Sequence, residues 1–303
     1  MRNVLSVAFW RDLYGILSGM KKKLIFVIAL LLLPLSGCAI ISVGYNYADA
    51  YLRYSINSYT SFNDVQKDII NKEVNDFMRW HRKSMLPEYV SFLQELQQAA
   101  RSGAALKKQD VVRLRSRVRT LYVKTLQPTV RPAASVLSGV DQEQIDELVK
   151  SFAKENNKQK DKELAGSLDD KLRKRSERTI DFLENLVGGF SDKQLEKIRE
   201  MSYQLPFATG LYIHQREDNQ ARLVELLKSK KGEAEIAAFL SAWLIAPDAN
   251  RSPEEQNILR AFENASDEMI ASIYGMLTDR QKKTLLKSIQ KYIDIFQDLA
   301  SNT

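Results

Sequence analysis

One short pattern occurs four times along the chain, and each copy fits the start of an α-helix. It consists of an apolar residue, a short polar residue, two further residues and a glutamine. The copies occupy residues 62–66, 140–144, 190–194 and 277–281. The short side chain can accept a hydrogen bond from an N–H of the first turn, and the glutamine can reach back to the N–H of the capping residue. The intervals are unequal, so we interpret the pattern as a recurring helix start rather than a solenoid repeat.

Apolar residues after these starts recur at the steps of three and four that a helix requires. The clearest series is Leu285, Ile289, Tyr292, Phe296 and Leu299, which predicts a seam against another helix. Turn-forming residues are scarce, with 12 Gly and 7 Pro in 303 residues, against usual shares of about 7% and 5%. No segment alternates apolar and polar residues as a strand would. We therefore predict an all-α fold, an antiparallel bundle of long amphipathic helices joined by short loops.

The helical part divides most simply near residue 190, into residues 61–189 and 190–303, or it forms one continuous domain. Residues 141–187 read as one long, interrupted helix that ends at the glycine pair 188–189. Within it, residues 154–163 contain no apolar side chain. We expect that stretch to be a solvated protrusion or a hinge.

Residues 1–37 have the features of an export signal. In this interpretation the signal starts at Met20, because three lysines follow it and residues 24–33 are wholly apolar. That apolar run is shorter than the roughly 20 residues that cross a bilayer. Residues 1–19 are not explained by an export signal that starts at Met20, and we interpret them as the result of an upstream start codon or as an extended N-terminal region of the signal.

The only cysteine in the chain, Cys38, directly follows Leu35, Ser36 and Gly37. This arrangement resembles the bacterial lipobox. The resemblance implies cleavage before Cys38 and lipid attachment, palmitate included, to that residue. With Ala39 next, it also implies transfer to the outer membrane of a Gram-negative cell. The alternatives are a plain signal peptide and a buried helix that happens to end in cysteine.

Composition excludes several classes of function. The leader holds five basic residues and one acidic residue, so its removal lowers the formal net charge from +7 to +3. A nucleic-acid partner is therefore not expected. One cysteine and two histidines leave little material for a metal centre, and no phosphate-binding loop or catalytic serine motif occurs. We expect no enzyme, no metal and no cofactor apart from the covalent lipid on Cys38.

Residues 38–60 form a tyrosine-rich segment beside the expected lipid. Tyr47, Tyr51 and Tyr54 are spaced for one helix face. Tyrosine suits the membrane interface because it has an apolar ring and a polar tip. The alternative is that these rings pack onto the bundle and seal one end.

Trp80, His81 and Arg82 form the densest mixed cluster. His81 continues the apolar stripe of the preceding helix, where it could act as an acid, a base or a ligand. The alternative is a core histidine held by one hydrogen-bond partner. The candidate binding surface comprises Tyr47, Tyr51, Tyr54, Trp80, His81 and Arg82.

Three features together resemble a proteobacterial family of helical lipoproteins of unknown function. They are the lipobox, the Tyr45-Asn46-x-Ala48-Asp49 stretch, and the Trp80-His81-Arg82 cluster followed by Leu86-Pro87. The resemblance implies a helical fold and a place in the envelope, and it carries no activity. A weaker similarity links residues 277–281 to the Leu-Thr-x-x-Gln motif of Spy/CpxP-type periplasmic chaperones.

The leading functional hypothesis is a lipid-anchored binding or scaffold protein on the periplasmic face of the outer membrane. It would contact the membrane through its lipid and bind an envelope protein or unfolded clients, as a chaperone does. One alternative is an enzyme acting on envelope lipid or cell-wall glycan, with His81 as acid or base and Glu73 as its partner. The other is a purely structural envelope lipoprotein.

Overall fold

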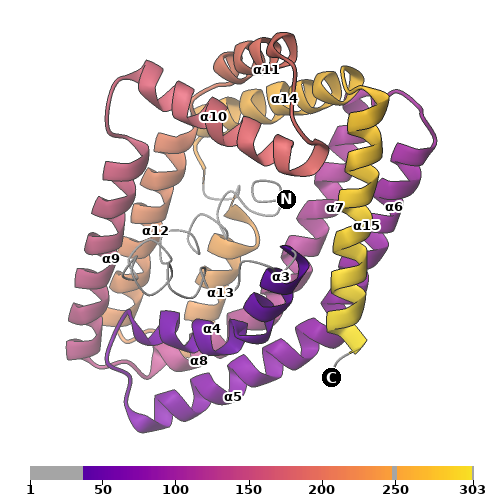
Figure 1. Ribbon diagram of the computed structural model, residues 1–303. Coiled ribbons are helices and arrows are strands. Elements are labelled where there is room, and N and C mark those ends of the chain that lie inside the picture. The colour runs from indigo at the N-terminus through magenta and orange to yellow at the C-terminus, as the bar shows by residue number, and fades with distance from the viewer. Residues whose placement is uncertain (1–36, 248–250, 302–303) are drawn as a thin grey trace, which may run out of the picture.

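A computed structural model describes residues 37–247 and 251–301 (Figure 1). Over these residues the fold contains helices and no strand, so the predicted all-α class is confirmed. The predicted leader, residues 1–37, lies outside the described residues except for Gly37. None of the described helices combines the length and the apolar character needed to cross a bilayer.

The elements follow one another with short connections. In chain order they are α3 (Gly37–Asn46), α4 (Ala48–Asn57), α5 (Asp64–Trp80), the π-helical turn η1 (His81–Met85), α6 (Leu86–Arg101), α7 (Lys108–Leu126), the 3-10 turn η2 (Gln127–Thr129), α8 (Val130–Ser138), α9 (Gln142–Glu163), α10 (Leu168–Val187), α11 (Asp192–Gln204), α12 (Thr209–Lys228), α13 (Glu233–Leu244), α14 (Pro253–Gly275) and α15 (Asp279–Ser301). All four expected helix starts are present, at α5, α9, α11 and α15.

The helices pack in neighbouring pairs along four sides of a frame (Figure 1). In that view α4, α5 and α8 form the lower side, and α10, α11 and α14 the upper side. The pair α9 and α12 lies on the left, and the pair α6 and α15 on the right. The bundle is therefore built from helix pairs rather than around one shared axis.

The apolar core is divided into clusters, and several of them join distant parts of the sequence. One contains Ile145 of α9, Leu223 of α12 and Ile236 of α13. Another contains Ile180 of α10 and Ile198 of α11. Both clusters hold side chains from either side of residue 190, so apolar packing continues across that point.

Two of the helix starts meet through their glutamines. Gln66 and Gln144 each accept a hydrogen bond from the backbone N–H of their own capping residue. The two side chains then bond to each other, with donor–acceptor distances of 3.2 and 2.6 Å. Gln66 also donates to the carbonyl of Gly139, and Gln144 to that of Ser61. We call this arrangement a glutamine junction.

The other two starts form a second glutamine junction of the same design. Gln194 and Gln281 bond to each other at 3.0 and 3.1 Å. Gln194 donates to the carbonyl of Met276, and Gln281 to that of Gly189. In both junctions the accepting carbonyl lies two residues before the partner's capping residue. The junctions therefore hold the α5 and α9 starts together, and the α11 and α15 starts together.

The helix contacts repeat in the same way. The packing of α6 on α15 is equivalent to that of α12 on α9. Likewise α5 packs on α8 as α11 packs on α14, and α7 packs on α14 as α13 packs on α8. The segments α5–α9 and α11–α15 thus have equivalent helix contacts. The last helix of each segment packs on the second helix of the other segment, α15 on α6 and α9 on α12. The unequal spacing of the four starts conceals this relation in the sequence.

The segment predicted as one interrupted helix forms two helices, α9 and α10. They separate at Gly166, whose φ of +89° favours glycine, and α10 ends at Gly188 as predicted. The expectation of a protrusion at residues 154–163 was wrong. Asn156 is buried and donates to Gln220 of α12 at 2.6 Å, so this stretch packs through polar contacts rather than apolar ones.

Candidate functional site

A π-helical turn joins α5 to α6 and sets the geometry of the site. The N–H of Leu86 donates to the carbonyl of His81, five residues back. Pro87 follows directly, and a proline has no N–H and would clash with the carbonyl four residues before it. A wider turn at this point removes the conflict. Turns of this kind are frequent at functional sites.

His81 lies in a chain of hydrogen bonds that crosses four elements. The Tyr45 hydroxyl of α3 is 2.8 Å from Nδ1 of His81, and Nε2 is 3.3 Å from the Tyr89 hydroxyl of α6. The Tyr89 hydroxyl is 2.6 Å from Oγ1 of Thr125 in α7, which donates to the carbonyl of Leu121 at 2.8 Å. We call Tyr45, His81, Tyr89 and Thr125, with Asn46 and Arg82, the latch.

The last donor in this chain fixes the direction of the others. Because the Thr125 hydroxyl donates to a carbonyl, it accepts from Tyr89, and the Tyr89 oxygen then accepts from Nε2 of His81. Nδ1 is left as an acceptor for the Tyr45 hydroxyl. The chain therefore assigns His81 as a neutral imidazole with its proton on Nε2.

The electrostatics of the site favour the same neutral form. Burial, with a smaller effect from the adjacent Arg82 cation, lowers the pKa of His81 to about 4. Burial also raises the pKa of Tyr45 to about 12 and raises that of Tyr89. All three side chains are therefore uncharged at neutral pH.

Arg82 fastens α3 to the end of the last helix. It donates to the carbonyl of Leu299 in α15 at 2.9 Å and to Oδ1 of Asn46 in α3 at 3.0 Å. Its guanidinium carbon lies 5.0 Å from the centre of the Tyr45 ring. A cation suits this position because the C-terminal end of a helix carries partial negative charge.

The remaining predicted site residues fall into two groups. Trp80 packs against the cluster around Met85 and contacts Phe77, with ring centres 5.7 Å apart. Tyr51 is partly buried, which raises the pKa of its hydroxyl. Tyr47 and Tyr54 point outward, with 69% and 60% of their surfaces exposed.

Glu73 and His81, the pair that the enzyme alternative requires, do not lie together. The carboxylate of Glu73 pairs with Lys72 at 3.0 Å, and its position in α5 lies about 12 Å along the helix axis from His81. His214, the other histidine, is exposed and pairs with Asp218 at 3.4 Å. Within the described part of the chain, no three His, Cys, Asp or Glu side chains gather as a metal site. Cys38 belongs to α3, but its side chain lies outside the described part.

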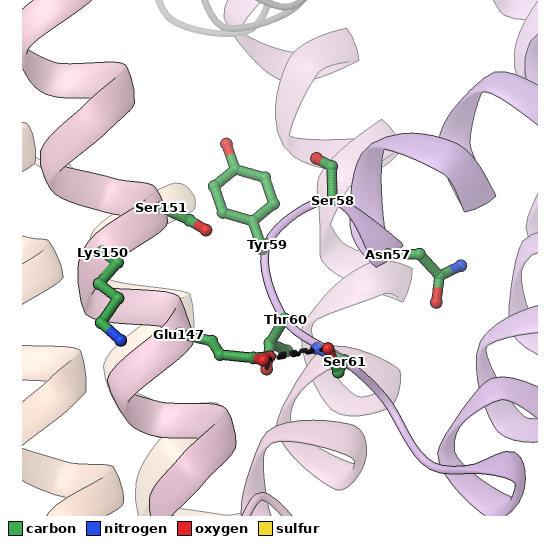
Figure 2. Close-up of a pocket in the computed structure, with 8 residues that line it drawn as sticks. All are labelled: Asn57, Ser58, Tyr59, Thr60, Ser61, Glu147, Lys150 and Ser151. Carbon is green, nitrogen blue, oxygen red and sulfur yellow. Dashed lines mark hydrogen bonds between the residues drawn. The ribbon is translucent and has the colours of Figure 1, made fainter.

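A pocket of about 290 Å³ lies where the α4–α5 connection meets α9 (Figure 2). Its lining is formed by Asn57, Ser58, Tyr59, Thr60, Ser61, Glu147, Lys150 and Ser151. The Glu147 carboxylate accepts from the Ser61 N–H at 2.6 Å and from the Thr60 hydroxyl at 3.0 Å, as Figure 2 shows. These donors lower the pKa of Glu147. Glu147 therefore holds the α4–α5 connection against α9.

Tyr45, Asn46, Tyr89 and Thr125 were not selected from the sequence as site residues. Tyr89 follows His81 by eight residues and carries a weak signal, because both lie on one nearly continuous helix. Tyr45 reaches His81 from 36 residues away, and Thr125 reaches Tyr89 from 36 residues away. No local pattern identifies such contacts.

The latch predicts a local effect of removing Arg82. We expect Arg82→Met to lower the free energy of unfolding by about 2 kcal/mol, because two hydrogen bonds to a charged group are lost. Protease cleavage within α3 should become faster. Arg79→Met is the matched control, since Arg79 is exposed and pairs only within α5, with Asp76, and it should change stability by less than about 0.5 kcal/mol. Equal cleavage rates in the two variants would contradict the latch.

A family model described as "Family of unknown function (DUF6279)" matches residues 58–256. The match includes His81, Arg82, Tyr89 and Thr125 of the latch, and it begins after Tyr45. No curated protein and no solved structure shows significant similarity to the chain.

Proposed function

The chain belongs to the DUF6279 family, whose function is unknown, and from this premise we propose that it is a lipid-anchored scaffold or binding protein. It acts without turnover on the periplasmic face of the outer membrane. Its anchor is an acylated Cys38, and its partner is a protein of the envelope.

The observation that carries this proposal is the attachment of α3 to the rest of the molecule. Cys38 lies in the first turn of α3, seven residues before Tyr45, or about 10 Å along the helix. Through Tyr45 and Asn46 the latch ties that helix to α6, α7 and α15. A lipid on Cys38 would then hold the frame in a defined orientation, as a scaffold requires, rather than on a flexible tether.

The environment of His81 supports a role without turnover. Both ring nitrogens already have hydroxyl partners, and a pKa of about 4 keeps the ring neutral. A general acid or base works best when its pKa lies near the working pH. His81 is better suited to holding α3 in place than to transferring protons.

Fractionation of wild-type cells and of a Cys38→Ala strain tests the proposal. We expect the wild-type chain in outer-membrane fractions, with acyl chains on the peptide that begins at Cys38, and the variant absent from those fractions and without acyl chains. Thermal unfolding of the variant produced without residues 1–37 provides the control that the frame still folds. An unmodified Cys38 in a soluble wild-type protein would refute the anchor and favour a plain signal peptide.

A further inference from the structure

We propose that Val43, Tyr47 and Tyr54 form a docking face that lies in the headgroup region of the bilayer that holds Cys38. The proposal rests on the anchor described above and adds a second contact with the membrane. This contact would fix which side of the frame faces the lipid.

These three side chains form an exposed apolar group. Their surfaces are 50%, 69% and 60% exposed, and they fall within a stretch of 12 residues. Among the described residues the other exposed large apolar side chains are Val65, Val149, Leu168 and Ile270. Those lie singly, on four different helices. Single exposed apolar residues are ordinary, whereas a group within one short segment indicates an interaction surface.

The helical spacing places the three side chains on one side of their segment. Tyr47 follows Val43 by four residues, and Tyr54 follows Tyr47 by seven, which are the steps of one helix face. Backbone bonds from Tyr47 to Val43 at 3.2 Å, and from Tyr51 to Tyr47 at 3.1 Å, carry the helical pattern through the joint between α3 and α4.

Tyr45 has the opposite orientation, because it bonds to His81 and packs against Leu86 and Leu299. Tyr51 shares the helix face of Tyr47 and Tyr54 and is partly buried. The segment is therefore divided into an inner face that binds the frame and an outer face that does not. Tyrosine is favoured at membrane interfaces because its ring is apolar and its hydroxyl can reach water and headgroups.

Position along the chain argues for lipid as the occupant, and the charge of the segment is compatible with it. The charged side chains of α3 and α4 are Asp49 and Arg53, which pair with each other at 2.9 Å, so the segment brings no net charge to the surface. Val43 lies about 8 Å from Cys38 along the helix, and Tyr54 no more than about 24 Å. A lipid inserted at Cys38 therefore keeps the outer face close to the same membrane surface.

The experiment uses the acylated full chain, in which a lipid-blocked Cys38 leaves any introduced cysteine as the one free thiol. Tyr47→Cys, Tyr54→Cys and the control Val149→Cys are labelled with a polarity-sensitive fluorophore. The proteins are placed in vesicles of phosphatidylethanolamine with a minority of phosphatidylglycerol. We expect quenching by lipids that carry a nitroxide near the headgroup at positions 47 and 54, and none at position 149. Tyr47→Ser combined with Tyr54→Ser should reduce quenching at a Val43→Cys label without changing the melting temperature.

The outcomes separate this proposal from the anchor. Mass spectrometry of the N-terminal peptide reports acylation independently of the fluorophore. An acylated chain with equal, water-like emission at positions 47, 54 and 149 would overturn the docking face and leave the anchor standing. An unmodified Cys38 would overturn both. Photo-crosslinking from position 47 in cells to a protein instead of lipid would also overturn the docking face.

Discussion

Replacing Gln144 with alanine is expected to lower the free energy of unfolding by about 3 kcal/mol, measured by urea denaturation. Gln144 is 5% exposed, and its amide bonds to Gln66, to the Asp141 N–H and to the Ser61 carbonyl. Truncation removes these hydrogen bonds, each of which contributes about 0.5–1.5 kcal/mol, and leaves the buried Gln66 amide without one of its partners. The effect is large because one side chain serves as both a helix cap and a link between helices.

Gln142→Ala provides the matched control, because it removes the same side chain from the same helix. Gln142 is exposed and bonds only within α9, to Asp146 at 2.9 Å. We expect a change below about 0.5 kcal/mol. A double-mutant cycle with Gln66→Ala should show losses that do not add, since the residues are direct partners. Additive losses would contradict the glutamine junction.

The equivalence of the two junctions extends the test. Gln281 is 6% exposed and forms the same set of bonds, with Gln194, Gly189 and its own capping residue. Gln281→Ala should therefore destabilise the chain about as much as Gln144→Ala. A negligible effect at one of the two positions would show that the junctions are not energetically equivalent.

Acid is expected to weaken the fold through His81 by about 3 kcal/mol between pH 7 and pH 4. The folded-state pKa of about 4 lies below the ordinary value of 6.5. Between these values the unfolded chain binds more protons than the folded chain, so the free energy of unfolding falls as the pH falls. Above about pH 6.5 the residue contributes no pH dependence. The cost arises because burial disfavours the charged imidazolium, with a smaller contribution from the adjacent Arg82 cation.

Several carboxyl groups with lowered pKa, including Asp49 and Asp170, also lose stabilising charge in acid. Their effect begins near the ordinary carboxyl range, below that of His81. Comparison with His81→Gln isolates the histidine, and the variant should show a flatter profile from pH 6.5 to pH 4. Nitrogen-15 NMR of the ring should report a proton on Nε2 at neutral pH. The interpretation fails if the wild-type and variant profiles run parallel.

Local chemistry made much of the fold predictable. A capping box needs residues only three positions apart, so the starts of α5, α9, α11 and α15 were recognisable from the sequence. The same holds for the end of α10, where Gly188 adopts a φ of +83°. Apolar spacing identified the helix class for the same reason.

Long-range pairing was not predictable from such patterns. Gln66 and Gln144 are 78 residues apart, and the pattern that identifies each as a cap says nothing about its partner. The polar stretch around Asn156 was misread as a protrusion because its partner, Gln220, is polar too. At the site, the apolar stripe identified His81 as a residue in the packed face, but Tyr45 reaches it from a different helix.

The packing of α15 on α6 and of α9 on α12 also determines the order in which the chain can fold. The apolar faces of Val90 and Leu93 in α6 are covered by Ile289 and Ile293 of α15, which is the last described helix to be synthesised. Neither α5–α9 nor α11–α15 can bury its apolar surface alone. The fold is therefore complete only after segments about 200 residues apart have come into contact. Such distant contacts slow folding and leave apolar surface uncovered meanwhile. A chain built this way spends the period between its synthesis and its closure in need of protection from aggregation.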